Sequence, residues 1–232
     1  VHIEKFKDLE KEMPTLRDYY KISDKLEDNA VKLEDISFTY FNSETEIFKD
    51  LNLEIKRNKH TVITGPNGSG KSTLLGLIAG IFYPDKGSVN LSSKNLGYVG
   101  VTPLIIDGTL RENLVYGNKK QINDNKIKEI IEEFNLFNEE NEIDLDMHIS
   151  NRSLSSGQMQ KISFIRSLLS DTQILLLDES TSNLDIKTKK FIFNILANKN
   201  ITIINSTHNK EDFDFDYHIK IDVGETRKLL IT

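Results

Sequence analysis

The sequence predicts a mixed α/β fold in which helices cover a mainly parallel β-sheet. In the last third of the chain, helical patterns at 158–169 and 186–196 alternate with buried-strand patterns at 174–177 and 201–204. A glycine-rich loop also joins a strand-like run to a helix-like run within residues 61–79. Because helical crossovers connect parallel strands, both observations favour a parallel sheet packed between helices.

The composition limits the class of protein. The chain has 232 residues, 38% of them hydrophobic, which is enough to bury the core of one large α/β domain. A net charge of −6 and the lack of a basic stripe argue against a nucleic-acid partner. The longest strongly apolar run, 74–82, is far shorter than the roughly 18 residues that a membrane helix needs. There is no cysteine, which fits a reducing compartment.

Residues 1–30 are dense in charge and are expected to be a lead-in segment before the domain proper, residues 31–232. The apolar residues near the start recur at the spacing of one helical stripe: Ile3, Phe6, Leu9 and Met13. A solvated helix with no role of its own is the alternative. Since the first residue is Val1, we also expect the chain to be a piece of a longer protein.

Two strand patterns precede the glycine-rich loop. Apolar residues alternate over 31–38, with a change of phase between Leu33 and Ile36 that indicates a bulge. A second alternating run follows at 48–55 after a polar turn. Together they predict an antiparallel lobe in front of the loop.

The remaining elements are shorter. Strand patterns occur at 88–91 and 96–99, and an amphipathic helix is expected around 127–134, beginning near Asn123 or Asp124. Residues 217–223 and 227–231 flank a turn that contains Gly224 and predict a closing hairpin.

The glycine-rich loop matches the pattern G-x-x-x-x-G-K-[ST], with Gly65, Gly70, Lys71 and Ser72 at the fixed positions. Small residues before a helix allow successive backbone N–H groups to surround an anion at the helix N-terminus. The strand before the loop and the helix after it are the context that the motif requires. The residues expected to bind nucleotide phosphates here are Gly65, Pro66, Asn67, Gly68, Ser69, Gly70, Lys71, Ser72 and Thr73.

Two adjacent carboxylates, Asp178 and Glu179, end the buried strand at 174–177, at the sheet edge where α/β proteins bind ligands. A Mg²⁺ ion on nucleotide phosphates explains the first, with Asp178 and the Ser72 hydroxyl as metal ligands. Glu179 is then placed to act as general base toward the attacking water. The alternative is that both carboxylates only cap the following helix.

The segment Leu154-Ser155-Ser156-Gly157-Gln158 resembles the L-S-G-G-Q signature of ATP-binding cassette (ABC) transporters. The glycine-rich loop, this signature, the carboxylate pair and a Ser206-Thr207-His208 segment follow one another in the family's order. The resemblance covers nearly all of residues 31–224. It implies a P-loop NTPase, RecA-like core with a mixed, mainly parallel sheet, an antiparallel β lobe and a helical subdomain at about 102–170 that carries the signature.

The resemblance also implies roles for single residues. The signature residues Ser155, Ser156, Gly157 and Gln158 would grip the γ-phosphate of ATP held by a second subunit. His208 would contact the γ-phosphate and act in catalysis together with Glu179. Tyr40 stands where the family places an aromatic ring on adenine, although a strand-end aromatic is often only part of the core or its rim.

The chain departs from the family pattern at several positions. Val101 replaces the Q-loop glutamine, whose side chain reaches magnesium in the family. Ser156 replaces the first signature glycine, and Lys161 stands where an arginine is common. Residues 147–153, just before the signature, lack the acidic residue that exporters often carry.

The segment "GTLRENL" at 108–114 resembles exporters more than importers. We therefore expect an ATP- and Mg²⁺-dependent ATPase domain of an exporter, at the cytoplasmic face of the membrane, with a transmembrane domain fused at its N-terminus. Its partner would be a second nucleotide-binding domain, identical or different. Two alternatives are a catalytically weak regulatory half of a heterodimer, which Val101 suggests, and a soluble ABC-type ATPase, which would need a long coiled-coil insertion.

Overall fold

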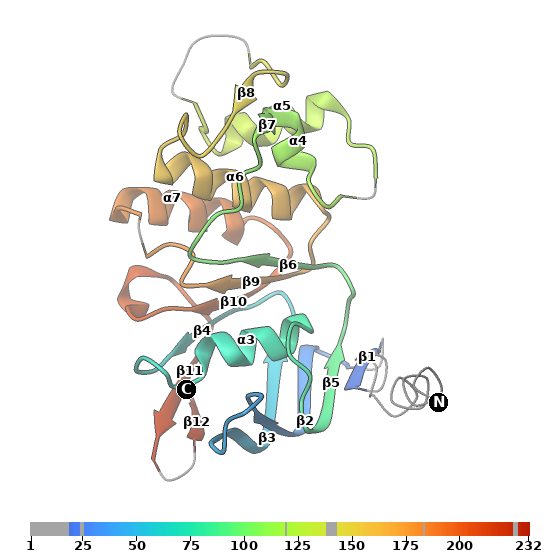
Figure 1. Ribbon diagram of the computed structural model, residues 1–232, viewed down its shortest axis with the longest axis vertical. Coiled ribbons are helices and arrows are strands. Elements are labelled where there is room, and N and C mark those ends of the chain that lie inside the picture. Colours follow the sequence, from blue (N-terminus) through green and yellow to red (C-terminus); the bar gives the residue numbers. More distant parts are fainter. Residues whose placement is uncertain (1–18, 24–25, 119, 138–142, 183, 225–226) are drawn as a thin grey trace, which may run out of the picture.

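The computed structural model describes residues 19–232 except 24–25, 119, 138–142, 183 and 225–226. The helical stripe expected at Ile3 to Met13 lies outside the described residues. The described part forms a six-stranded sheet with a smaller four-stranded sheet below it and a helical region above it (Figure 1). No helix in this described part is long and apolar enough to span a membrane.

The six-stranded sheet is parallel except at one edge. Its strands stand in the order β12, β11, β4, β10, β9 and β6, and only the β11–β12 pair is antiparallel. This arrangement confirms the predicted α/β fold and its closing hairpin. The bounds are β4 (His60–Thr64), β6 (Leu96–Val99), β9 (Ile174–Asp178), β10 (Thr202–Ser206), β11 (Tyr217–Val223) and β12 (Arg227–Ile231).

Helices lie on both faces of this sheet. Helix α3 (Lys71–Ala79) packs below it, and α6 (Ser156–Leu169) and α7 (Ile186–Ala197) pack above it (Figure 1). Strand β9 is buried throughout because its side chains alternate between two cores: Ile174 and Leu176 join the core around α3, while Leu175 and Leu177 join the core around α6. The sheet therefore separates the two helical layers.

The four-stranded sheet forms the predicted lobe. Its order is β1 (Tyr20–Ile22), β5 (Lys86–Leu91), β2 (Asn29–Thr39) and β3 (Glu46–Lys56). Strand β2 pairs antiparallel with β3 and β5, whereas β1 pairs parallel with β5. The register between β2 and β3 shifts between Leu33 and Ile36, as the change of phase predicted. Strand β1 falls in the range expected to be a lead-in segment, yet it pairs with β5, and the Tyr20 hydroxyl donates to the carbonyls of Leu77 and Ile78 at the end of α3.

The helical region contains short elements that the sequence patterns did not indicate. They are β7 (Gly108–Thr109), β8 (His148–Ile149) and α4 (Leu110–Val115), which starts with a capping box between Thr109 and Glu112. Helix α5 (Asp124–Glu133) begins after Asn123, whose side chain accepts from the Asn125 N–H, in agreement with the expected start. A 3₁₀ turn, η1 (Lys210–Asp212), connects β10 to β11.

Candidate nucleotide-binding site

The phosphate loop, residues 65–72, leads from the end of β4 into α3. Gly68 and Gly70 have φ of 75° and 105°, a left-handed range that side-chain-bearing residues rarely adopt. Gly70 is the N-cap of α3, and in the part of the chain that the structure describes no side chain caps this helix start. The first N–H groups of the helix are therefore open to an anion.

Gly65 is glycine because of close packing. A Cβ added at Gly65 would lie 2.6 Å from the Ser69 Oγ and 2.9 Å from the Ile221 carbonyl oxygen. Neither approach is possible without displacing the loop or β11. The start of the loop thus lies directly against the closing hairpin.

Lys71 is almost buried, with 5% of its surface exposed. Its Nζ donates to the carbonyls of Gly65, at 3.0 Å, and Pro66, at 3.4 Å. The same ammonium lies 3.6 Å from the Glu179 Oε1. Lys71 therefore links the first residues of the loop to the second carboxylate of the predicted pair.

Asp178 is held by three hydroxyl groups at the end of β9. Its Oδ1 accepts from Ser72 Oγ and Ser206 Oγ, both at 2.9 Å, and its Oδ2 accepts from the Tyr98 hydroxyl at 2.8 Å. Burial, and after it the hydrogen bond to Asp178, raises the pKa of Tyr98, so this hydroxyl remains a donor. The carboxylate is therefore fixed in orientation toward the phosphate loop.

The sequence did not indicate Tyr98 as a site residue, and it indicated Ser206 only as the first residue of the Ser206-Thr207-His208 segment, without a role of its own. Both lie on strands next to β9: Tyr98 faces Leu176 across the β6–β9 pair, and Ser206 faces Asp178 across the β10–β9 pair. A search for hydroxyl residues near the carboxyl ends of all the predicted strands would have included them.

The Glu179 carboxylate lies near the side chains of His208 and Lys71. Its Oε1 is 2.8 Å from the His208 Nε2 and 3.6 Å from the Lys71 Nζ. Its backbone has φ of 49°, and its N–H donates to the Ser206 carbonyl. A non-glycine residue in this conformation is strained, and such strain is typical of functional sites. The structure therefore brings both predicted catalytic residues to the phosphate loop.

Tyr40 also reaches this region, from the end of β2. Its hydroxyl is 2.7 Å from the Thr73 Oγ1 in the first turn of α3. Its ring meets Phe38 and Phe82 edge to face, and 39% of the residue is exposed. An exposed aromatic ring beside the phosphate loop is placed where a nucleotide base could pack.

The signature segment lies apart from these residues. Ser155 caps α6: its Oγ accepts from the Gln158 N–H, and its own N–H donates to the Gln158 Oε1. Among the described residues, Ser155 to Gln158 make no hydrogen bond to the phosphate loop, and α6 and α3 lie on opposite faces of the sheet (Figure 1). A cavity of about 410 Å³ adjoins the signature and is lined also by Leu136, Lys161, Leu184, Asp185 and Thr188.

Val101 occupies an irregular segment after β6. It is 42% exposed, and the preceding Gly100 carbonyl accepts from the Nε2 of buried Gln160, on α6. Lys161, the other departure on this helix, donates to the Asn135 carbonyl at 2.7 Å.

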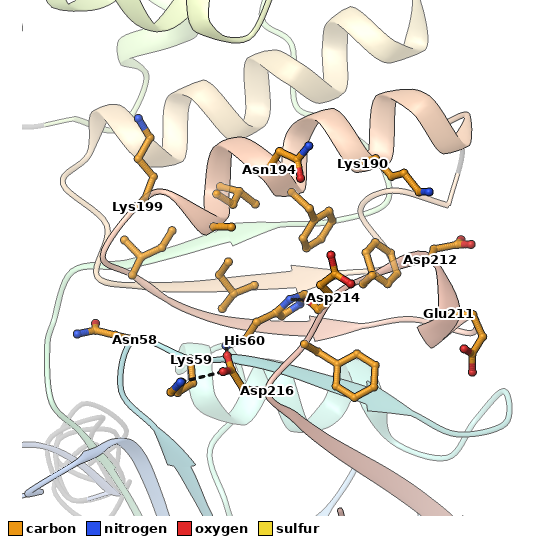
Figure 2. Close-up of a pocket in the computed structure, with 17 residues that line it drawn as sticks. Asn58, Lys59, His60, Lys190, Asn194, Lys199, Glu211, Asp212, Asp214 and Asp216 are labelled. Atoms are coloured by element: carbon orange, nitrogen blue, oxygen red, sulfur yellow. Dashed lines mark hydrogen bonds and ion pairs between the residues drawn. The ribbon is translucent and has the colours of Figure 1, made fainter.

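A second cavity, of about 520 Å³, lies at the opposite end of β4 from the phosphate loop (Figure 2). His60 lies in its wall, stacked on Phe193 with ring centroids 5.2 Å apart, and its Nδ1 is 2.6 Å from the Asp214 carbonyl oxygen. Because His60 begins β4 and the phosphate loop follows Thr64 at the end of that strand, this cavity is separate from the nucleotide-binding region.

The strand β4, the loop and the helix α3, together with Asp178 at the end of β9, which β10 separates from β4, define a P-loop nucleotide-binding fold. The family model described as "ABC transporter" matches residues 48–182. The chain therefore belongs to the ABC transporter family and contains its ATP-binding domain. This confirms the resemblance that the sequence motifs indicated.

Individual relatives agree with this assignment. The chain is 34% identical over 203 residues to the "ATP-dependent permease MDL1" of Candida albicans, covering 77% of this chain and 29% of the relative. It is 33% identical over 194 residues to the "Lactococcin-A transport/processing ATP-binding protein LcnC" of Lactococcus lactis subsp. lactis, covering 77% and 27%. The chain thus spans less than a third of the length of these relatives.

The fold agrees with a solved structure described as a bacterial Atm1-family ABC exporter with ATP bound. The TM-score is 0.77 at 22% identity, over 91% of this chain and 40% of the other. This similarity confirms the predicted fold class.

Proposed function

We propose that the chain binds ATP together with Mg²⁺ and hydrolyses it as the motor domain of an ABC exporter. The observation that carries this proposal is the convergence of Lys71, Asp178, Glu179 and His208 at one edge of the sheet, against an uncapped helix start. Relatives described as a permease and as a transport protein support the coupling to transport.

The donor set at Asp178 fits Mg²⁺. The ion prefers oxygen ligands and keeps several waters, so one carboxylate and one serine hydroxyl are sufficient protein ligands. Asp178 and Ser72 offer these two oxygens 2.9 Å apart. When bound, Mg²⁺ would neutralise negative charge on the β- and γ-phosphates.

Residues of the chain bind the nucleotide and activate the attacking water. The N–H groups at the start of α3 bind the phosphate oxygens, and the Lys71 ammonium, now on backbone carbonyls and near Glu179, turns to the β- and γ-phosphates. The Glu179 carboxylate accepts a proton from the attacking water, and His208 orients this carboxylate and contacts the γ-phosphate. Tyr40 packs on the base.

In the assembly that we propose, the signature of one copy closes on the nucleotide of another nucleotide-binding domain. The location of α6 on the opposite face of the sheet from α3 supports this arrangement, because the signature does not face the phosphate loop of its own chain. A membrane domain, fused at the N-terminus of the chain or carried by another chain, would place the protein at the cytoplasmic face of the membrane.

Two variants test the proposal. Lys71→Ala removes a charge-assisted contact of about 1.5 to 3 kcal/mol, so ATP affinity should fall by roughly 10- to 150-fold. Glu179→Gln should retain ATP affinity and lose phosphate release. The measurements are titration with a fluorescent ATP analogue in the presence of Mg²⁺ and steady-state phosphate release.

Lys94→Ala, at an exposed lysine in the turn between β5 and β6, is the matched control and should behave like the parent. Equal affinity of parent and Lys71→Ala would overturn the assignment of the phosphate loop. If the parent binds ATP normally but releases no phosphate, the result would support the alternative that Val101 suggests, a catalytically weak regulatory half of a heterodimeric transporter.

A further inference from the structure

Arg227, the first residue of β12, donates to three backbone carbonyls in two other parts of the chain. Its Nη1 lies 3.2 Å from the carbonyl oxygens of Glu46 and Ile47, at the start of β3. Its Nη2 lies 3.2 Å from the carbonyl oxygen of Gly68, in the middle of the phosphate loop. The planar guanidinium can make these bonds together because its donors point in fixed directions.

Arg227 is linked to two of the three glycines in the loop, Gly68 and Gly70. Gly68 has φ of 75°, and a Cβ added there would meet no atom within 4 Å, so no neighbouring group packs against this side of the residue. A Cβ added at Gly70 would lie 3.2 Å from the Ile47 Cγ2 and 3.0 Å from the Phe48 ring. Arg227 thus bonds to the Gly68 carbonyl and also to the carbonyl of Ile47, whose side chain lies beside Gly70.

The closing hairpin supports the loop from a second direction. Strand β11 runs parallel to β4, with Lys220 facing Thr64, and the Ile221 carbonyl lies next to Gly65. Figure 1 shows the β11–β12 hairpin below β4 and beside β3 of the lobe. The hairpin therefore contacts the start of the phosphate loop through β11 and its middle through Arg227.

We propose that Arg227 is a positioning residue for nucleotide binding: it holds the Gly68 carbonyl and the start of β3 so that the phosphate loop has its curved shape before the nucleotide arrives. A glycine-rich loop that must be ordered on binding loses conformational entropy, and fixing it in advance removes part of that cost. This inference rests on the proposed function, since it concerns the affinity of the same ATP site.

The test compares Arg227→Met, Arg227→Lys and the parent for ATP affinity, with thermal unfolding measured without nucleotide. Arg227→Met loses all three hydrogen bonds to backbone carbonyls, and this loss should weaken ATP binding roughly three- to tenfold. At saturating ATP the kcat should be almost unchanged, so the loss appears as a higher KM. Arg227→Lys should recover only part of the affinity, because an ammonium cannot reproduce the guanidinium's fixed fork of donors.

Lys228→Met is the matched control: it removes a neighbouring positive charge at an exposed position of β12 and should leave affinity unchanged. If Arg227→Met does not fold, Arg227→Gln, which retains an amide donor, is used in its place. Affinity equal to the parent in the folded variant overturns the proposal, whatever happens to thermal stability. Full recovery by Arg227→Lys also overturns it, because charge alone would then account for the effect. Failure of the parent itself to bind ATP would overturn the proposed function.

Discussion

Asp178 illustrates how much of the site depends on single side chains outside the recognised motifs. The three hydroxyls that bond to it come from α3, β10 and β6, three elements far apart in the sequence. Only Ser72 belongs to the glycine-rich motif. Because each oxygen of the carboxylate has its own donors, the side chain is oriented before any metal binds.

Tyr98→Phe should weaken the response to Mg²⁺. The change leaves the Asp178 Oδ2 without its phenol donor while the ring stays in place. We expect the Mg²⁺ concentration for half-maximal activity to rise by roughly three- to tenfold, while ATP affinity measured with EDTA stays the same. Tyr83→Phe, at a tyrosine that is 48% exposed, is the control. An unchanged Mg²⁺ response would show that Ser72 and Ser206 orient the carboxylate without Tyr98.

Val101→Gln should raise turnover several-fold and leave ATP affinity nearly unchanged. The valine side chain has no oxygen, so water or the Thr102 hydroxyl would take the place of the glutamine that the family resemblance implies as a Mg²⁺ ligand, and we expect the aligned state to lose one contact. Val101 is 42% exposed, so a longer polar side chain can be accommodated without burial. Steady-state kinetics with Val101→Met as a control of equal length test this. Unchanged or reduced turnover would mean that the segment tolerates valine without a functional effect.

The residues that the sequence identified belong to short local motifs, and Asp178, Glu179 and His208 were linked to the phosphate loop only by the order of motifs that the family resemblance supplied. Gly65, Gly70 and Lys71 lie in one loop, so a pattern over eight residues is sufficient to find them. Tyr98, Ser206 and Arg227 reach the site only because of strand order in the folded sheet, which no local pattern contains. Their contribution depends on pairing between segments that are distant in the chain.

At the scale of elements, the same distinction explains which helices and strands could be predicted. Long hydrophobic runs with a helical period predicted α5, α6 and α7, and the change of phase in the strand pattern predicted the bulge in β2. Helix α4 has six residues, too few for a hydrophobic period, and it begins through its capping box. Three residues of a charge-dense segment form strand β1 because they can pair with the edge of β5.

His60, at the start of β4, should make the free energy of unfolding depend on pH. Burial is the main reason why the pKa of His60 is below its ordinary value; the Asp214 carbonyl and the carboxylates of Asp214 and Asp216 oppose this shift. The Asp216 carboxylate also accepts from the His60 backbone N–H and from Lys59, which faces the same region. The unfolded chain therefore takes up a proton first as pH falls. Stability should be full above about pH 6.5 and decrease below it, toward the lower pKa of the folded state.

His60→Phe keeps the stacking on Phe193 and removes the titration. The dependence of the urea midpoint on pH between 7.5 and 5.5 should become weaker in this variant, although it should not vanish, because burial lowers the pKa of His218 as well. An equal slope for His60→Phe and the parent would show that His60 does not contribute. The slope is the quantity compared, since the mutation also removes the bond to the Asp214 carbonyl.

At the scale of the whole molecule, the six-stranded sheet separates two functional surfaces. The phosphate loop precedes α3 in the core shared with the lobe, and the signature precedes α6 in the core shared with α4 and α5. The signature's own hydrogen bonds complete a helix cap, and its Ser156 and Gly157 lie beside the cavity of about 410 Å³. Motif order revealed the family, whereas this separation became apparent only from the topology.

Glu179→Gln should form an ATP-dependent dimer. The amide cannot accept the proton from water, so ATP persists, while Lys71, Ser72 and the start of α3 still bind it. Each signature can then close on the phosphates held by the other copy, and the helix start of α6 favours that negative charge. Light scattering with ATP and Mg²⁺ should show a dimer, and with ADP a monomer. Ser156→Arg in the same background places a large side chain at the start of α6 and should prevent the dimer without reducing ATP affinity. A Glu179→Gln variant that binds ATP yet stays monomeric at high concentration would contradict the sandwiched arrangement, and a dimer that persists with Ser156→Arg would place the interface elsewhere.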